Sequence, residues 1–344
     1  MGIPRIEALD LHATLPSGQR NLITDVPGVR VGHVTVREGE VNTGVTAVLP
    51  HPGNLFQDKV MASAAVINGF GKSIGILQVQ ELGTIETPIL LTNTLSVGTA
   101  FTGLCRYMLA QNPDIGDSTG TVNCLVTECN DGRLNDIRGL HIREEHVLEA
   151  ISAAGEEFEE GGVGGGTGMC CLGLKGGIGS ASRRLDIDGT SYTVGALVMA
   201  NFGRAGDLVV GGRHIDTRGA GDRLAKKDDG SIIMLLATDI PLSERQLGRT
   251  ARRAAVALGR TGSFCGSGSG DIAIAFTTAN RISHYGDRAL LPCRMLRDDR
   301  IDPVFLAAVE AVEEAIVSAL YHARTITGRQ GRTSVGLRDF LGLE

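Results

Sequence analysis

Apolar and polar residues alternate between residues 21 and 50, where the sequence reads NLITDVPGVRVGHVTVREGEVNTGVTAVLP. Alternation with a period of two predicts β-strands that bury one face and expose the other. Pro27-Gly28 interrupts the pattern with residues that are typical of a tight turn. This segment therefore predicts two or three strands of one sheet.

Longer segments follow a helical period. From Thr94 to Asn112 apolar residues recur at spacings of three and four, and Pro113 follows. The small-residue segment 59–73, which ends in glycines, is also predicted to be helical. Three further predicted helices lie at 143–155, at 243–260 with a Ser243/Gln246 capping box and Gly259 as its end, and at 302–326 behind Asp302-Pro303.

Further strands are predicted at 123–129, 191–201, 231–238 and 270–280. Neighbouring strands are joined by short turns as often as by helices, and no Pro-rich or Ser-rich linker divides the chain. These features predict a layered α/β protein with largely antiparallel or mixed sheets between helices. We expect residues 1–344 to form one such domain.

Composition narrows the function classes. The net charge is −6 and the basic residues are scattered, so we expect no nucleic-acid partner. The first twenty residues hold no apolar segment, and no apolar run reaches membrane-spanning length, so neither a signal peptide nor a membrane span is predicted. Seven cysteines without paired CxxC spacing indicate reduced thiols, which favours the cytoplasm.

The dipeptide Gly230-Ser231 lies where a charged loop, KKDD, meets the apolar run SIIMLLAT. If the bond between them is cut, Ser231 carries both a hydroxyl and an α-amine whose pKa lies near ~7.7–8.0. Such a residue combines nucleophile and base and needs no histidine. A glycine at 230 leaves room for the hydroxyl to approach the preceding carbonyl. Gly-Ser is also a common loop ending, so the dipeptide alone does not decide the function.

Other chemistries find less support. NGFGKS at 68–73 lacks the first glycine of a P-loop, and no serine lies in a GxSxG elbow. His141 and His146 are five residues apart, a spacing that does not align two ligands on a helix, so no metal site is predicted. Cys129 and Cys265 are better explained as small buried residues than as nucleophiles.

The order of motifs along nearly the whole chain resembles the DmpA-type family, which includes L-aminopeptidase/D-esterase/amidases and β-peptidyl aminopeptidases. The motifs are ITDVPGVRVGH, NTGVTAVLPH, ETPILLTNTLSVG, ECNDGRLND, VGGGTGMCC, KGGIGSASR, VGALVMANFG, GSIIMLLATDIPLSERQLGRTARRAA and SGDIAIAFTTAN. The resemblance implies a four-layer αββα sandwich of the N-terminal-nucleophile type. It also implies self-processing into an α chain, 1–230, and a β chain, 231–344, which stay associated in a homo-oligomer of four or more copies.

The resemblance also implies residue roles. Gly230-Ser231 becomes the processing site and Ser231 the nucleophile. Ser269 and Asp271 in SGD would tune the Ser231 amine, although many relatives have Glu where this chain has Asp271. Asn201 in ANFG matches the amide that stabilises the oxyanion, and Lys175 in KGGIG is a further catalytic candidate.

One motif departs from the family. In TECNDG, where relatives often have an oxyanion-binding tyrosine, this chain offers Asn130, which can donate but is shorter. Candidates for binding the substrate amine are Glu128, Asp131 and Asp117.

The combined prediction is a cofactor-independent aminopeptidase or amidase acting on small peptides, amino-acid amides or esters. Two alternatives stay open. One is an acyltransferase similar to the ornithine acetyltransferases, which typically have Thr at the cut. The other is an uncleaved, non-catalytic binding protein.

Overall fold

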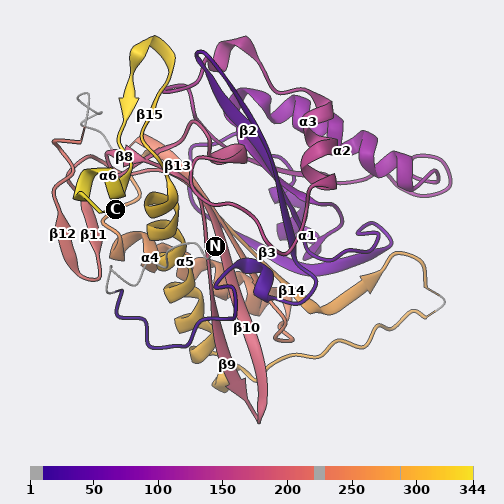
Figure 1. The fold of residues 1–344 in the computed structure, drawn as a ribbon. Helices are drawn as coiled ribbons and strands as arrows, with labels where there is room; N and C mark the ends of the chain where they lie inside the picture. Colours follow the sequence, from indigo (N-terminus) through magenta and orange to yellow (C-terminus); the bar gives the residue numbers. More distant parts are fainter. Residues whose placement is uncertain (1–10, 221–228, 287, 344) are drawn as a thin grey trace.

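Two β-sheets lie face to face and helices cover both outer faces (Figure 1). The computed structural model describes residues 11–220, 229–286 and 288–343, so the charged run at 226–228 and the first ten residues lie outside the described part. The layers confirm the predicted α/β architecture with mixed sheets.

The smaller sheet has the strand order β1-β2-β5-β6. Its strands are β1 (Arg30–Glu38), β2 (Val41–Leu49), β5 (Ile89–Asn93) and β6 (Leu125–Cys129). β1 and β2 form an antiparallel hairpin, as the alternation predicts, with Gly39 in the left-handed region at its turn. β5 and β6 are parallel, so a helix has to connect them, and α2 (Val97–Gln111) does so.

The larger sheet has the order β4-β3-β14-β13-β10-β9. Its strands are β3 (Asp58–Gly69), β4 (Thr84–Ile85), β9 (Gly177–Ile187), β10 (Thr190–Asn201), β13 (Asp229–Thr238) and β14 (Gly268–Ser283). Its one parallel pair, β13 and β14, is again joined through a helix, α4 (Glu244–Arg260).

The prediction of a helix at 59–73 is wrong, because most of this segment is strand β3. Val60 and Ala64 pack between the two sheets, whereas Met61 and Ala65 contact the helical layer. Both faces of the strand are therefore covered, so the sequence shows no alternation of apolar and polar residues. The side chains are small because α4 packs closely: a Cβ added at Gly248 would lie 2.9 Å from the hydroxyl of Ser63.

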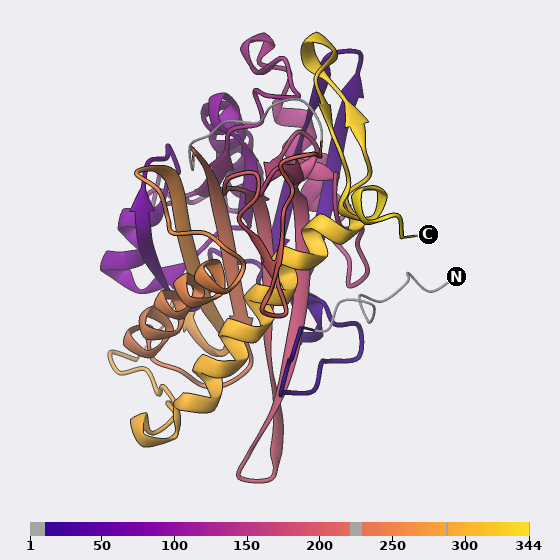
Figure 2. The ribbon, with the colours of Figure 1, turned by 90° about the vertical axis from the view of Figure 1, so that its left-hand side faces the viewer.

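The helices form the two outer layers. α2 and α3 (Glu144–Ser152) contribute to the apolar cluster over the smaller sheet, and α4 and α5 (Asp302–His322) cover the larger one (Figures 1 and 2). The capping box of α4 is confirmed, since Ser243 N donates to Gln246 Oε1 at 3.0 Å. Gly259 does not end α4, which runs to Arg260 before the left-handed Gly262.

Short elements complete the chain. They are α1 (Ile76–Leu82), β7 (Cys170–Cys171), β8 (Leu174–Lys175), β11 (Leu208–Val210), β12 (Arg213–Ile215), β15 (Ile326–Thr327), β16 (Thr333–Ser334) and α6 (Leu337–Leu341). α5 ends at His322, so the predicted helical end at 326 is wrong, because Ile326 pairs with Ser334 in a small hairpin.

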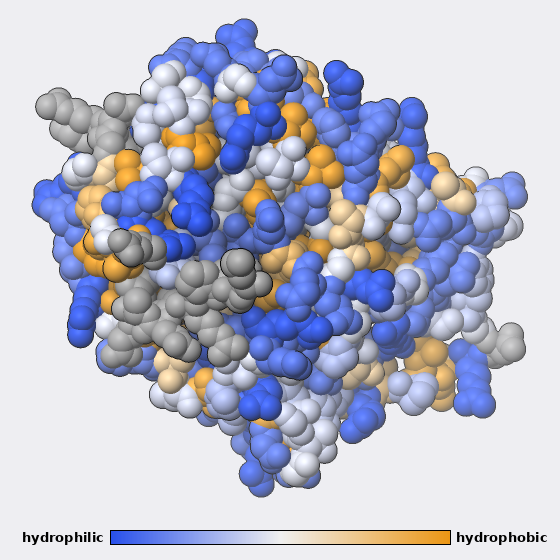
Figure 3. All heavy atoms as spheres, in the orientation of Figure 1, coloured by the Kyte–Doolittle hydropathy of each residue, from blue (hydrophilic) through white to orange (hydrophobic). Residues whose placement is uncertain are grey.

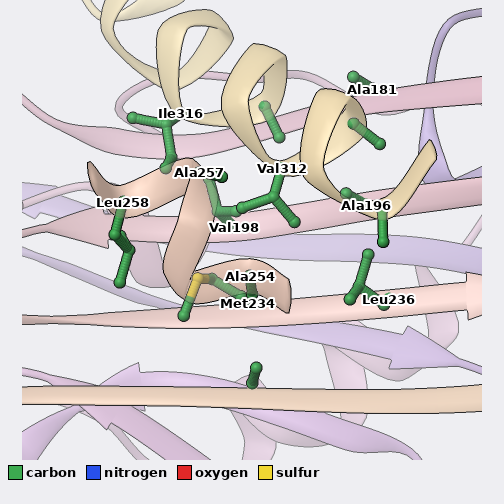
Figure 4. Packing of buried hydrophobic residues seen from close by; sticks show 14 of the residues in the cluster. Ala181, Ala196, Val198, Met234, Leu236, Ala254, Ala257, Leu258, Val312 and Ile316 are labelled. Carbon is green, nitrogen blue, oxygen red and sulfur yellow. The ribbon is translucent and has the colours of Figure 1, made fainter. Parts of the chain in front are cut away.

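The core consists of three apolar layers, one between the sheets and one under each pair of helices. Figure 4 shows the largest, where Ala254 and Leu258 of α4 and Val312 of α5 lie over side chains of β10 and β13. The outer face in Figure 3 is mostly hydrophilic, with small separate apolar patches. Among the described residues, no helix combines the length and apolar character that a membrane crossing requires.

The contact between β9 and α5 predicts a sensitive position. A Cβ on Gly179 would lie 2.0 Å from the carbonyl oxygen of Ala315, so Gly179→Ala must push α5 away from the sheet. We expect a loss of about 2–3 kcal/mol of stability, seen as a lower thermal unfolding midpoint. Gly98→Ala is the matched control. Its Cβ would meet nothing within 4 Å on helix α2, so this variant should be unchanged or slightly stabilised. An unchanged midpoint for Gly179→Ala would contradict the close packing.

Candidate active site

Three neighbouring strands bring the predicted catalytic residues to one place. In the sheet register, Ser231 at the start of β13 is opposite Asn201, the last residue of β10. On its other side Ser231 pairs with Gly270, and Gly230 pairs with Ser269. Residues that are 30 and 38 positions from Ser231 therefore lie on adjacent strands. The sheet, rather than a loop, fixes their relative positions.

Ser231 is 5% exposed, and its Oγ donates a hydrogen bond of 2.5 Å to the carbonyl oxygen of Gly230. The hydroxyl is thus next to the peptide bond that joins the two residues. The structure gives a further reason for glycine at 230, beside the predicted room for the hydroxyl. A Cβ there would lie 2.1 Å from the carbonyl oxygen of Asn201, so it would collide with the neighbouring strand.

Ser269 and Asp271 form a buried pair on β14, the strand next to Ser231. Ser269 Oγ donates to Asp271 Oδ1 at 2.6 Å, and each residue is 1% exposed. The aspartate is therefore long enough to bind the serine. Both lie on β14, and Gly270 between them allows close approach, since a Cβ there would be 3.0 Å from Ser231 Oγ.

The side chain of Asn201 is held at both ends. Its Oδ1 accepts a hydrogen bond from Cys170 N at 2.9 Å, and its Nδ2 donates to Asn130 O at 3.1 Å. These two bonds fix the orientation of the amide.

A pocket of about 540 Å³ opens onto Ser231 and Asn201. Its described lining residues are Phe70, Lys72, Thr94, Glu128, Asn130, Arg133, Cys170, Leu172, Gly173, Asn201, Gly203, Ala205, Gly230, Ser231, Gly268 and Arg332. This volume is within the usual range of small-molecule sites.

Glu128 is the one acid among these lining residues. It is 3% exposed, accepts a hydrogen bond from Lys72 N at 2.8 Å and another from the hydroxyl of Thr94. Asn130 also lines the pocket, with its Oδ1 accepting from Gly132 N at 2.9 Å.

The other predicted residues do not line the pocket. Asp117 is exposed in the turn after α2. Asp131 is fully buried, and burial raises the pKa of its carboxyl to about 7.

Lys175 is also fully buried, and burial lowers the pKa of its ammonium to about 8. Its Nζ donates to three carbonyl oxygens, those of Gly166, Met169 and Gly176, at 3.0, 2.9 and 2.6 Å. All three ammonium donors are thereby used, so Lys175 holds the glycine-rich loop in place.

Sequence reasoning missed the basic residues of the pocket. Arg133 lies three residues after Asn130 in the same motif, so its spacing offered a signal. Lys72 appeared only as part of an incomplete P-loop. Arg332 comes from the β15–β16 hairpin, and nothing in the sequence connects it to Ser231.

Within the described ranges, no group of three or more His, Cys, Asp or Glu side chains is arranged to hold a metal ion. The chemistry that the described residues can perform is nucleophilic: a buried hydroxyl, a carboxylate and serine beside it, and a fixed amide donor facing the same pocket.

Comparison with known proteins finds relatives over nearly the whole chain. The model of peptidase family S58 matches residues 21–334. The β-peptidyl aminopeptidase BapA of Sphingosinicella microcystinivorans is 39% identical, over 96% of this chain and 88% of its own length. The crystal structure of the PH0078 protein of Pyrococcus horikoshii OT3 is 52% identical with a TM-score of 0.91, covering 96% of this chain and 95% of that one.

A third relative is a solved structure whose fold is named. The L-aminopeptidase D-Ala-esterase/amidase of Ochrobactrum anthropi, a variant of the Ntn hydrolase fold, is 36% identical with a TM-score of 0.89 and covers 97% of this chain and 96% of that one. The chain described here has this N-terminal-nucleophile hydrolase fold, and it belongs to peptidase family S58.

Proposed function

We propose that this protein is a self-processing aminopeptidase that cuts itself between Gly230 and Ser231 and then uses Ser231 as an N-terminal nucleophile. The observation that carries the proposal is the position of the Ser231 hydroxyl. It lies 2.5 Å from the Gly230 carbonyl oxygen and lines the same pocket as Asn201 and Glu128.

Processing proceeds through an acyl shift. The Oγ of Ser231 adds to the carbonyl carbon of Gly230, the C–N bond breaks, and the amide nitrogen takes the hydroxyl proton. Water then hydrolyses the resulting ester. The products are the carboxylate of Gly230 and a Ser231 that carries a free hydroxyl and a free α-amine.

Catalysis uses both groups of the processed Ser231. Its amine takes the hydroxyl proton while Oγ attacks the substrate carbonyl, and it then protonates the leaving amine. Asn201 donates to the oxyanion, and Ser269 and Asp271 hydrogen-bond the Ser231 amine. Water releases the acyl group from the serine. The proposed steps require no cofactor.

Glu128 is the proposed partner of the substrate ammonium, because it is the one carboxylate among the described lining residues. We extend to this chain the preference for a free amino end that the names of its relatives imply. The expected substrates are small peptides, amino-acid amides or esters. Association of the α and β chains, a homo-oligomer and a cytoplasmic location remain predictions.

Replacing the nucleophile tests the processing step. We expect purified wild-type protein to give two bands on a denaturing gel, with the smaller beginning at SIIML. Ser231→Ala should give a single full-length band and no hydrolysis, because the attacking oxygen is gone. Ser267→Ala removes an exposed hydroxyl two residues before Ser269 and is the matched control, expected to process normally. An intact wild-type chain that hydrolyses aminoacyl amides at full rate would refute the proposal.

Replacing Asn201 tests its proposed role as the donor to the oxyanion. Asn201→Ala should lower kcat by about 100- to 1,000-fold, with a smaller change in KM, because the bond to the oxyanion forms only in the transition state. Rates are normalised to the amount of processed β chain, determined on the same gel. A rise in KM at unchanged kcat would instead assign Asn201 to ground-state binding.

A further inference from the structure

The pocket has a basic side that processing and acyl transfer do not use. Arg133 and Arg332 both line it. Among the described residues, neither forms an ion pair with an acid, and the one polar side-chain bond of Arg332 goes to the neutral Gln330, from Nη2 to Oε1 at 2.7 Å. Two guanidinium groups therefore lie at this pocket without carboxylate partners from the described chain.

Of the two arginines, Arg133 gives the stronger evidence for a binding site. Its Nε and Nη2 are buried from solvent and have no hydrogen-bond acceptor among the described residues. The residue as a whole is partly exposed at the pocket, where the Cys170 side chain is its neighbour, and its guanidinium stays charged. A guanidinium that lines a pocket can pair with the two oxygens of a carboxylate in a bidentate geometry.

Hydrogen bonds of Arg329 join the segments that carry the two arginines. Arg329 N donates to Leu134 O at 2.8 Å, and Arg329 Nη1 donates to Gly132 O at 3.4 Å. The β15–β16 hairpin that carries Arg332 thus packs on the loop that carries Arg133.

Glu128 shares no hydrogen-bond partner with the two arginines, since it accepts from Lys72 N and from the hydroxyl of Thr94. The described lining of the pocket thus combines one acid with two guanidinium groups.

We propose that Arg133, assisted by Arg332, binds a carboxylate of the substrate on the leaving-group side of the scissile bond. The preferred substrates are then short peptides with a free carboxylate, such as dipeptides, rather than uncharged amides or esters. This inference rests on the proposed function and names the substrate class of the same site. The carboxylate can be the peptide's C-terminus or an acidic side chain in the leaving residue.

Three peptides with the same N-terminal residue distinguish these cases: one ending in alanine with a free C-terminus, the same peptide with a C-terminal amide, and one ending in glutamate with a C-terminal amide. A preference for the first assigns the C-terminal carboxylate, and a preference for the third assigns the side chain. We expect kcat/KM to favour a carboxylate peptide over the alanine amide by about tenfold or more, mainly through KM.

Variants of Arg133 test whether this residue binds the carboxylate. Arg133→Met should reduce the ratio of the two kcat/KM values toward one, and Arg133→Lys should retain part of it, because a lysine keeps the charge but loses the bidentate fork. Arg138→Met replaces an exposed arginine that does not line the pocket, and it should retain the whole preference. The thermal unfolding midpoint of each variant is measured alongside.

The outcomes separate the two proposals. If processed wild-type protein cleaves all three peptides equally well, the proposed carboxylate site is wrong, but the proposed aminopeptidase activity is unaffected. This comparison uses the wild-type protein alone. A preference that persists in Arg133→Met overturns the assignment to Arg133. Processed protein that cleaves no peptide overturns the proposed function together with this inference.

Discussion

The site depends on the hydrogen-bond register of three strands. β13 pairs with β10 on one side and with β14 on the other, so that Asn201 lies opposite Ser231 and Ser269 lies opposite the adjacent Gly230. A shift of one residue would turn Ser231 toward the opposite face of the sheet and replace it with Ile232. The apolar residues of β13, which are buried on both faces, oppose such a shift, so the core between the layers also maintains the geometry of the site.

Close packing of backbone is the second constraint. Gly230 and Gly270 flank Ser231, and in each case a side chain would collide with the backbone of a neighbouring strand or loop. The glycine-rich loop held by Lys175 follows the same logic, since a Cβ at Gly166 would lie 2.5 Å from Ile178 N. The many glycines of the chain therefore allow the layers to approach each other around a small pocket.

The sequence predicted those parts of the site that lie at strand ends. Ser231 and Asn201 lie where an apolar run begins or ends, which is a local signal. The β3 segment was misjudged because a strand covered on both faces has no polar period. Arg332 could not be predicted, because it reaches the pocket through a hairpin about 100 residues after Ser231. The partners of Lys175 are carbonyl oxygens, which no residue identity reveals.

The strand order of the larger sheet has a consequence for a chain cut after Gly230. β13 and β14 would belong to the carboxy-terminal fragment, yet they lie between β3 and β10 of the amino-terminal one. The β13–β14 pair of one fragment would lie between two strands of the other, hydrogen-bonded to β3 on one side and to β10 on the other. Neither fragment could leave without rupturing two ladders and exposing the apolar residues beneath them. The nick would thus alter covalent connectivity while the molecule persists as a single cooperative body.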